Sequence, residues 1–277
     1  MPTRRSFVEA ATAATLVAPA LAGATNKPGL AKMSTPVLPD IAFAQHEPFL
    51  HRERATAIMA AEGLDALVVG GGRNVFYATN FFPLLERMSF ATTALAVIPR
   101  DMRRSVGLVI PSFSYYYIEA DDGLVPGVQP FVFTSPVGYR DSPRGDGEPP
   151  ATDPLTYRIH SEGGVSARER HRRATIEAAA PYTSNMERAL AQALRELGIS
   201  SGRVGYDDAG VLPLLLHALP GVSAVAAEDT LRRVRLVRTA PEIKMMRIAA
   251  QNNVDAALAT VRAARELGTL RAVRQRF

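Results

Sequence analysis

The sequence contains no cysteine among its 277 residues. This absence excludes disulfide bonds, thiolate-ligated zinc, iron–sulfur clusters and a cysteine nucleophile. Histidine is also scarce. The five histidines form no H-E-x-x-H or similar metal-ligand spacing. No serine stands in a G-x-S-x-G turn, the nucleophile motif of α/β-hydrolases. We therefore expect neither a metal site nor a complete nucleophilic site among these residues.

The chain also lacks a strong excess of charge and a long apolar run. The net charge is +5, from 32 basic and 27 acidic side chains, and the excess is scattered. The densest basic run, residues 168–173, has no interleaved aromatic residues for base stacking, so we interpret it as a solvated helix face and expect no nucleic-acid partner. No stretch after the first 24 residues approaches the 18 apolar residues of a membrane span.

The N-terminal segment has the pattern of an export signal. Arg4 and Arg5 precede a weakly apolar, Ala- and Thr-rich run that ends near Leu21, and small-x-small sites follow at residues 20–22 and 22–24. Paired arginines ahead of such a run indicate the twin-arginine route. We expect residues 1–24 to be a signal peptide, residues 25–45 to be a Pro- and Gly-containing linker, and the mature protein to be periplasmic or secreted with no membrane contact.

The rest of the chain alternates predicted strands with predicted helices. The continuous apolar run at residues 66–69 is typical of a strand covered on both faces. Further strands are predicted at 91–98 and 106–110 (a hairpin), 131–133, 203–206 and 222–226. Helices are predicted at 47–61, after the capping boxes Ser166/Glu169 and Ser184/Glu187, at 211–218 and at 239–267, with a long surface loop at 134–165. This alternation predicts the α/β class.

Two motifs have possible chemical roles, and both also have plainer interpretations. Gly70-Gly71-Gly72 follows a strand, but it lacks the Gly-Lys-Ser/Thr end of a P-loop and the third glycine of a dinucleotide fingerprint, so we interpret it as a tight strand exit. The pairs Asp121-Asp122 and Asp207-Asp208 have no histidine nearby, and we interpret them as turn or edge carboxylates.

Several segments together resemble the N-terminal domain of the creatinase and Xaa-Pro peptidase family. They are GLDALVV at 63–69, NVFYATNF at 74–81, TALAVIP at 93–99, RVGY at 203–206, and residues 232–238 followed by TAPEI at 239–243. The resemblance covers residues 46–267 in order. It implies a three-layer α/β domain with a mixed sheet at 46–238, and at 239–277 the opening helix of an incomplete pita-bread catalytic domain.

The resemblance also carries expectations about the site. In the peptidases of this family, two metal ions are held by an Asp, Asp, His, Glu, Glu set that would follow the helix at 243–267, so we expect no metal ligand and no cofactor in this chain. In creatinase-like members, an arginine after the Asn-x-x-Tyr segment helps to hold the substrate near a neighbouring subunit's active site. Arg87 stands at about that place, and the alternative is a surface arginine that pairs with Glu86 or solvent.

The sequence therefore predicts an exported, non-catalytic N-terminal domain of an Xaa-Pro peptidase or creatinase-like protein. One alternative is a part of an active metal-dependent Xaa-Pro aminopeptidase or dipeptidase, or of a creatinase-like hydrolase or lyase, that further sequence completes. The other is a standalone interaction module. Expected partners are a second copy of this chain, in a homo-oligomer, or a full-length paralogue.

Overall fold

A computed structural model describes residues 42–83, 85, 93–115, 124–133, 166–167, 170–171, 174, 183 and 185–276. The chain divides into two compact units, one of residues 41–245 and one that includes residues 246–276. Arg87, the pair Asp121-Asp122, the predicted loop at 134–165, the predicted signal peptide at 1–24 and residues 25–41 of the predicted linker (25–45) lie outside the described residues.

A six-stranded mixed sheet forms the centre of the first unit. Its strands lie in the order β4-β3-β2-β1-β5-β6. They are β1 (Ala66–Val69), β2 (Leu95–Pro99), β3 (Val106–Pro111), β4 (Val128–Phe133), β5 (Arg203–Tyr206) and β6 (Ser223–Ala226). The β1–β2 and β2–β3 pairs are antiparallel, while β1–β5, β3–β4 and β5–β6 are parallel. The predicted β2–β3 hairpin and the mixed sheet are both confirmed.

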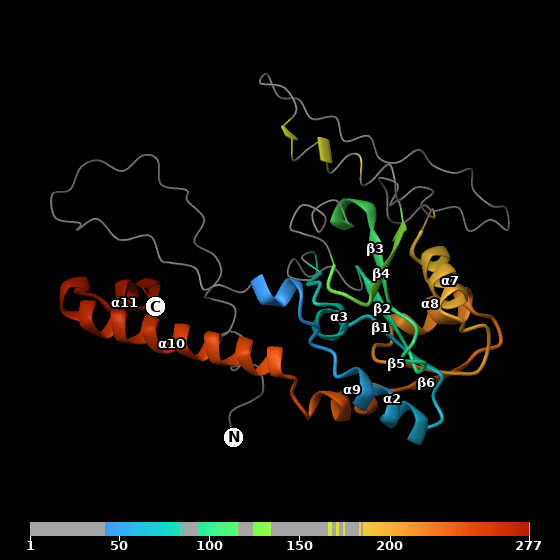
Figure 1. Cartoon of the computed structure of the whole chain (residues 1–277). Coiled ribbons are helices and arrows are strands. Elements are labelled where there is room, and N and C mark those ends of the chain that lie inside the picture. The colour runs from blue at the N-terminus through green and yellow to red at the C-terminus, as the bar shows by residue number, and fades with distance from the viewer. Residues whose placement is uncertain are drawn as a thin grey trace. The chain divides into compact units, whose positions relative to one another are not determined.

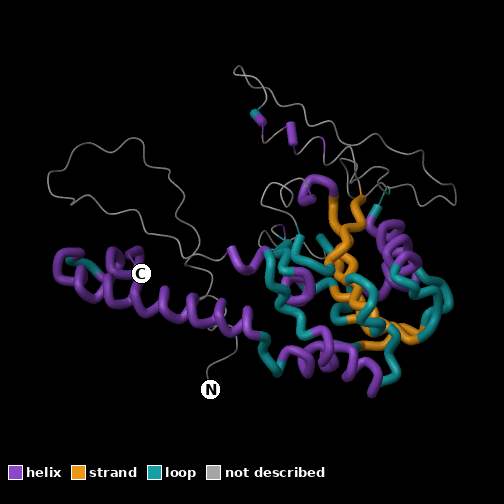
Figure 2. The backbone as a smooth tube through the Cα atoms, viewed as in Figure 1, coloured by secondary structure: helices purple, strands orange, loops and turns teal. Residues whose placement is uncertain are grey.

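Helices cover both faces of this sheet, which Figure 2 shows as the layer between them. Helices of the first unit, among the described residues, include η1 (Ala42–Gln45), α2 (Arg52–Ala61), α3 (Gly72–Thr79), α7 (Met186–Glu196), α8 (Val211–Ala218) and α9 (Glu228–Arg235). Buried residues of α2, α3 and α9 share one core with Leu67 and Ile98. Buried residues of α7 and α8 share the other core with Val68 and Val97 (Figure 1). The domain is therefore a three-layer α/β structure, as the resemblance implies.

Some element boundaries differ from the sequence prediction. The helix predicted from residue 47 begins at Arg52, because Pro48 disfavours helical backbone before it and the His51 side chain accepts the cap hydrogen bond from the Arg54 N–H. The N-cap of α7 is Asn185 rather than Ser184, since the Asn185 side chain accepts from the Arg188 N–H at 2.9 Å. The sequence analysis missed α3 and α9, which are each only eight residues long.

The predicted C-terminal helix is confirmed as α10 (Ala240–Leu267), and α11 (Leu270–Arg276) follows it after Gly268, whose φ is +66°. The predicted capping box is also present: the Thr239 N–H donates to Glu242 Oε2 at 3.0 Å, and the Glu242 N–H donates to Thr239 Oγ1 at 3.4 Å. Several large apolar residues of α10 are exposed, namely Ile243, Met246, Val254, Leu258 and Val261. Among the described residues, no helix is long and apolar enough to cross a bilayer.

Candidate functional site

The carboxyl ends of β1 and β5 meet where the two chain connections diverge. After β1 the chain enters α3, whose buried residues belong to one core, and after β5 it enters α8, whose buried residues belong to the other. Ligands of open α/β sheets bind at such a switch point, in the crevice outside the strand ends. The carboxyl ends of β1 and β5 therefore form the candidate site of this sheet.

The side chain of Asp207 lies at this switch point, between the exit of β1 and the end of β5. Its Oδ1 accepts a hydrogen bond from the Gly70 N–H at 2.8 Å, and its Oδ2 accepts from the Gly71 N–H at 3.3 Å and from Asn74 Nδ2 at 2.7 Å. Gly71 is the N-cap of α3 and has no side chain that could accept from the N–H groups of the helix. Asp207, which follows β5, supplies the acceptor instead. A Cβ on Gly71 would lie 3.2 Å from Asp207 Oδ2, which is tighter than ordinary contact.

This finding corrects one interpretation made from the sequence, that of Asp207 as a turn or edge carboxylate. The glycine triplet is a strand exit, as predicted, but its N–H groups bind the carboxylate of Asp207. Asp208 is the exposed turn carboxylate that was expected, since its Oδ1 accepts from the Gly210 N–H at 2.8 Å. Asp207 instead ties β5 to the start of α3, a role that no local sequence pattern indicates because the two segments are separated by more than 130 residues.

The polar network continues from Asn74 to α9. Arg235 Nη1 donates to Asn74 Oδ1 at 2.8 Å, and the Arg235 guanidinium lies 5.5 Å from the centre of the Tyr77 ring. The Tyr77 hydroxyl accepts from the His51 N–H at 3.1 Å. Arg235 and Asn74 were not singled out from the sequence, and the signal for Asn74 was its place directly after the glycine triplet and Arg73.

Burial dominates the electrostatics of this network. It raises the pKa of Asp207 above its ordinary value, against the opposing effect of the three hydrogen bonds that the carboxylate accepts. Burial also raises the pKa of Tyr77, and burial followed by the nearby Arg238 lowers the pKa of Arg235. Because the oxygens of Asp207 already accept three donors, we interpret this carboxylate as a structural tie rather than as an acid–base catalyst.

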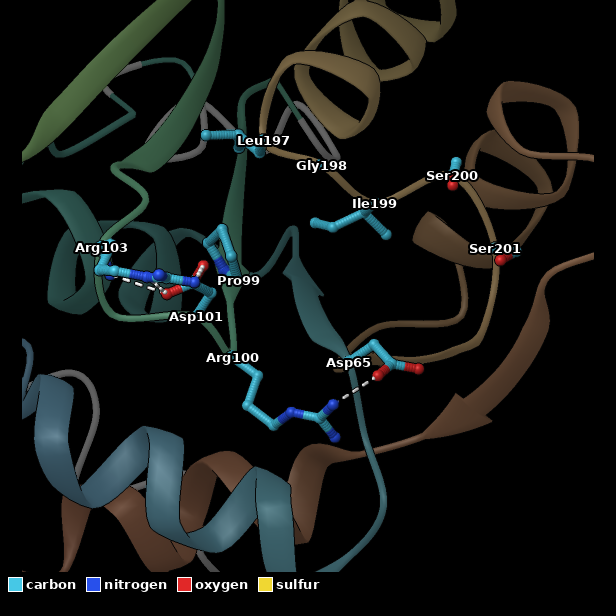
Figure 3. A pocket seen from close by; sticks show the side chains of 10 residues that line it. All are labelled: Asp65, Pro99, Arg100, Asp101, Arg103, Leu197, Gly198, Ile199, Ser200 and Ser201. Atoms are coloured by element: carbon cyan, nitrogen blue, oxygen red, sulfur yellow. Dashed lines mark hydrogen bonds and ion pairs between the residues drawn. The ribbon is translucent and has the colours of Figure 1, made fainter.

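A cavity of about 400 Å³ lies at the opposite ends of β1 and β5, beside the β2–β3 turn and the end of α7. Figure 3 shows Arg100 directed at Asp65 and Arg103 directed at Asp101, and the two ion pairs measure 2.9 Å each. The hydrogen bonds from Arg103 lower the pKa of Asp101 to about 2. Each of these charged groups is paired with another residue that lines the cavity, so the lining offers no isolated charge for a ligand.

The described residues contain no group of three or more His, Asp or Glu side chains that could hold a metal ion. His51 caps α2, and His217 Nδ1 lies 3.6 Å from Glu187 Oε1, so neither lies in a ligand cluster. Arg87, the residue that the resemblance implies for substrate binding, lies outside the described part of the chain.

Residues 51–133 match the family model of the creatinase/prolidase N-terminal domain. This segment belongs to that family. The match runs from the residue before α2 to the last residue of β4, and it includes α3 and the glycine exit that binds Asp207. The creatinase/prolidase N-terminal domain of this chain thus supplies one half of the switch-point network, while Asp207 and Arg235 come from the sequence that follows the matched segment.

Solved structures with similar folds include three peptidases. A prolidase from Pyrococcus horikoshii is 16% identical, with a TM-score of 0.42 over 76% of this chain and 42% of that chain. A prolidase from Thermococcus sibiricus is 13% identical, with a TM-score of 0.43 over 76% and 43%. A creatinase N-terminal superfamily domain of a dipeptidase from Streptococcus thermophilus is 10% identical, with a TM-score of 0.37 over 66% and 97%. This chain thus spans about two fifths of the two prolidases. No curated protein matches the sequence.

The tie between Asp207 and the glycine exit can be tested by its removal. Replacing Asp207 with Ala leaves three partly buried donors without an acceptor, and we expect the free energy of unfolding to fall by about 2–4 kcal/mol. Chemical denaturation measures this loss. The matched control is Asp208→Ala, which removes an exposed carboxylate with a single turn hydrogen bond and should cost less than about 1 kcal/mol. Equal losses in the two variants would contradict the proposed tie.

The ionisation of Asp207 gives a second prediction. Because burial raises its folded pKa above the unfolded value of about 3.9, the contribution of this group to stability is fully present below that value and is lost as the pH rises through the folded pKa. We expect the side-chain carboxyl carbon of Asp207 to titrate in NMR with a midpoint above 3.9. A midpoint at or below that value would show that the three hydrogen bonds outweigh burial.

Proposed function

We propose that this chain provides the N-terminal domain of an exported Xaa-Pro peptidase-like or creatinase-like protein, and that metal-dependent chemistry belongs to a different domain. The family match over residues 51–133 carries this proposal. Two half-buried carboxylates of the described part support it, since Asp207 binds the N–H groups of the glycine exit and Asp65 pairs with Arg100. A two-metal hydrolytic centre needs several oxygen ligands gathered around one water.

In this proposal the domain contributes binding rather than bond cleavage. Arg87 follows α3 by eight residues, and a guanidinium is suited to hold a substrate carboxylate in a bidentate manner. We propose that Arg87 contacts substrate at an active site that another domain or subunit supplies. The substrate class would be peptides with a proline after the scissile bond, or a small amidino compound, as the two family names indicate.

A peptidase assay tests the division of labour. We expect the purified chain, supplied with manganese, cobalt or zinc, to show no cleavage of Ala-Pro or Gly-Pro and no stoichiometric tight binding of two metal ions by calorimetry. The physical reason is that Asp65, Asp101 and Asp207 bind protein donors, and the described residues hold no group of three carboxylate or imidazole side chains that could ligate a metal ion.

An Arg87→Ala variant controls for contaminating peptidases. Trace turnover from a contaminant would be the same in both preparations. Turnover that survives repeated purification and falls in the variant would show that this chain is itself catalytic, and the proposal would then be wrong.

Export is a separate part of the proposal and has its own test. Replacing Arg4 and Arg5 with Lys should leave the precursor in the cytoplasm, because the twin-arginine route reads the arginine pair rather than the positive charge alone. Cell fractionation and N-terminal sequencing measure the outcome, and we expect the exported form to start near Gly23 or Thr25. The matched control changes the pair Arg103 and Arg104 to Lys and should export normally. Exported protein that still begins at Met1 would rule out the cleaved signal.

A further inference from the structure

The segment of residues 43–49 lies between the end of α3 and the beginning of α10. It comprises most of η1 and the chain that leads from η1 toward α2, and side chains from both sides hold its backbone. Asn80 bonds it from the α3 side, and Thr239 bonds it from the α10 side. All of these groups belong to the unit of residues 41–245. We call residues 43–49 the brace segment.

Asn80 is the residue that anchors the brace segment to α3. It is the C-cap of α3 and has a φ of 57°, the one positive value among the described non-glycine residues. Its Oδ1 accepts from the Phe49 N–H at 3.0 Å, while its Nδ2 donates to the carbonyl oxygens of Ala44 at 2.7 Å and Glu47 at 2.9 Å. The carbonyl groups near the end of η1 lack helical partners, so this amide satisfies groups that the short helix leaves open.

Only an asparagine at position 80 meets all of these requirements. A left-handed backbone is tolerated best by Gly, and next by Asn and Asp. An Asp would accept from Phe49 but would place a negative oxygen against two carbonyl groups, and a Gly would bond to none of the three. The cost of the left-handed conformation is therefore offset by three specific hydrogen bonds.

Thr239 holds the other side of the brace segment. Its Oγ1 donates to the Phe49 carbonyl oxygen at 3.2 Å, so one residue, Phe49, is bonded through its N–H to Asn80 and through its C=O to Thr239. Thr239 is also the first partner in the capping box of α10, and Glu242 of that box accepts from Arg238 Nη1 at 2.8 Å. The start of α10 is thus connected to Phe49 through a single side chain.

Two further contacts fix the same turn of α10. The ammonium group of Lys244 lies 3.8 Å from the centre of the Phe43 ring and 4.0 Å from Glu47 Oε1. The Phe49 ring is 3% exposed and packs edge-to-face on Phe76 of α3, with centroids 5.4 Å apart. The brace segment therefore contacts α3 and α10 through both backbone and side chains.

We propose that the brace segment couples the end of α3 to the first turn of α10, with Asn80 and Thr239 as its positioning residues. The chain that leaves α3 leads toward Arg87, and the chain of α10 leads into the second compact unit. Loosening either anchor loosens the other, because both act on the two sides of one peptide residue. The proposal does not depend on the proposed function, since it concerns the mechanics of this domain alone.

Amide hydrogen exchange on the full chain tests the coupling. Asn80→Gly keeps the left-handed backbone but removes all three side-chain hydrogen bonds. We expect faster exchange at the Phe49 N–H and, as the decisive result, exchange faster by about three- to tenfold at the Glu242 and Ile243 N–H groups, which corresponds to the loss of roughly one hydrogen bond. Unchanged exchange in α10 while Phe49 opens would overturn the proposal.

A matched control and a second variant exclude a general loss of stability. Asn185→Gly removes the cap of α7, in the other core, and should leave Glu242 and Ile243 unchanged; equal acceleration there would overturn the proposal. Thr239→Val should accelerate exchange at Phe49, whereas Thr239→Ser, which keeps the hydroxyl, should restore it. The effects of Asn80→Gly and Thr239→Val should combine to less than their product, because the second change acts on a coupling that is already lost. Multiplicative effects would mean that the two anchors are independent.

Discussion

The structure of the first unit depends on the burial of β1 from both faces. Its four residues, Ala66 to Val69, are all at most 1% exposed, and they alternate between the two cores. Burial of a Val or Leu side chain stabilises a domain by about 1.5–3 kcal/mol, so this short strand needs helices on both sides. The connections after β1 and β5 therefore have to leave in opposite directions, and the switch point at their ends is a consequence of covering both faces.

That geometry leaves backbone N–H groups at the end of β1 without a partner in the sheet or in the helix that follows. The N–H groups of Gly70 and Gly71 point out of the sheet at the start of α3, where the helix also carries a partial positive charge. In many α/β proteins such donors hold a phosphate or another anion. Here the carboxylate of Asp207 occupies them, although burial raises its pKa and so opposes its charge. The donors at these strand ends are therefore already used within the protein itself.

Much of the fold could be predicted from the sequence, because its strongest signals are local. The apolar run of β1, the β2–β3 hairpin and the capping box at Thr239 each lie within a short window, and the structure confirms all three. The short helices α3 and α9 were missed, whereas α8, which has the same length, was predicted; α3 and α9 hold fewer apolar residues than α8 and therefore show a weaker helical period. The sequence of α10 likewise does not indicate which surface its exposed residues, such as Val254 and Val261, would pack against.

The site is harder to predict because its parts are joined only by the fold. Asp207 and Asp208 are adjacent residues of the same type, so the sequence does not distinguish them. In the structure, Asp207 is half-buried against α3 and Asp208 is exposed in a turn. Both residues follow the end of β5, and the difference lies in their partners: Asp207 accepts from the N–H groups at the β1 exit, whereas Asp208 accepts from the Gly210 N–H in the next turn. The role of Asn80 is equally hard to predict from the sequence, since its side chain bonds three backbone groups that lie more than 30 residues earlier in the chain. In both cases a single polar side chain replaces contacts that the short neighbouring helices cannot make for themselves, and such a role becomes visible only when the strands and caps are in place.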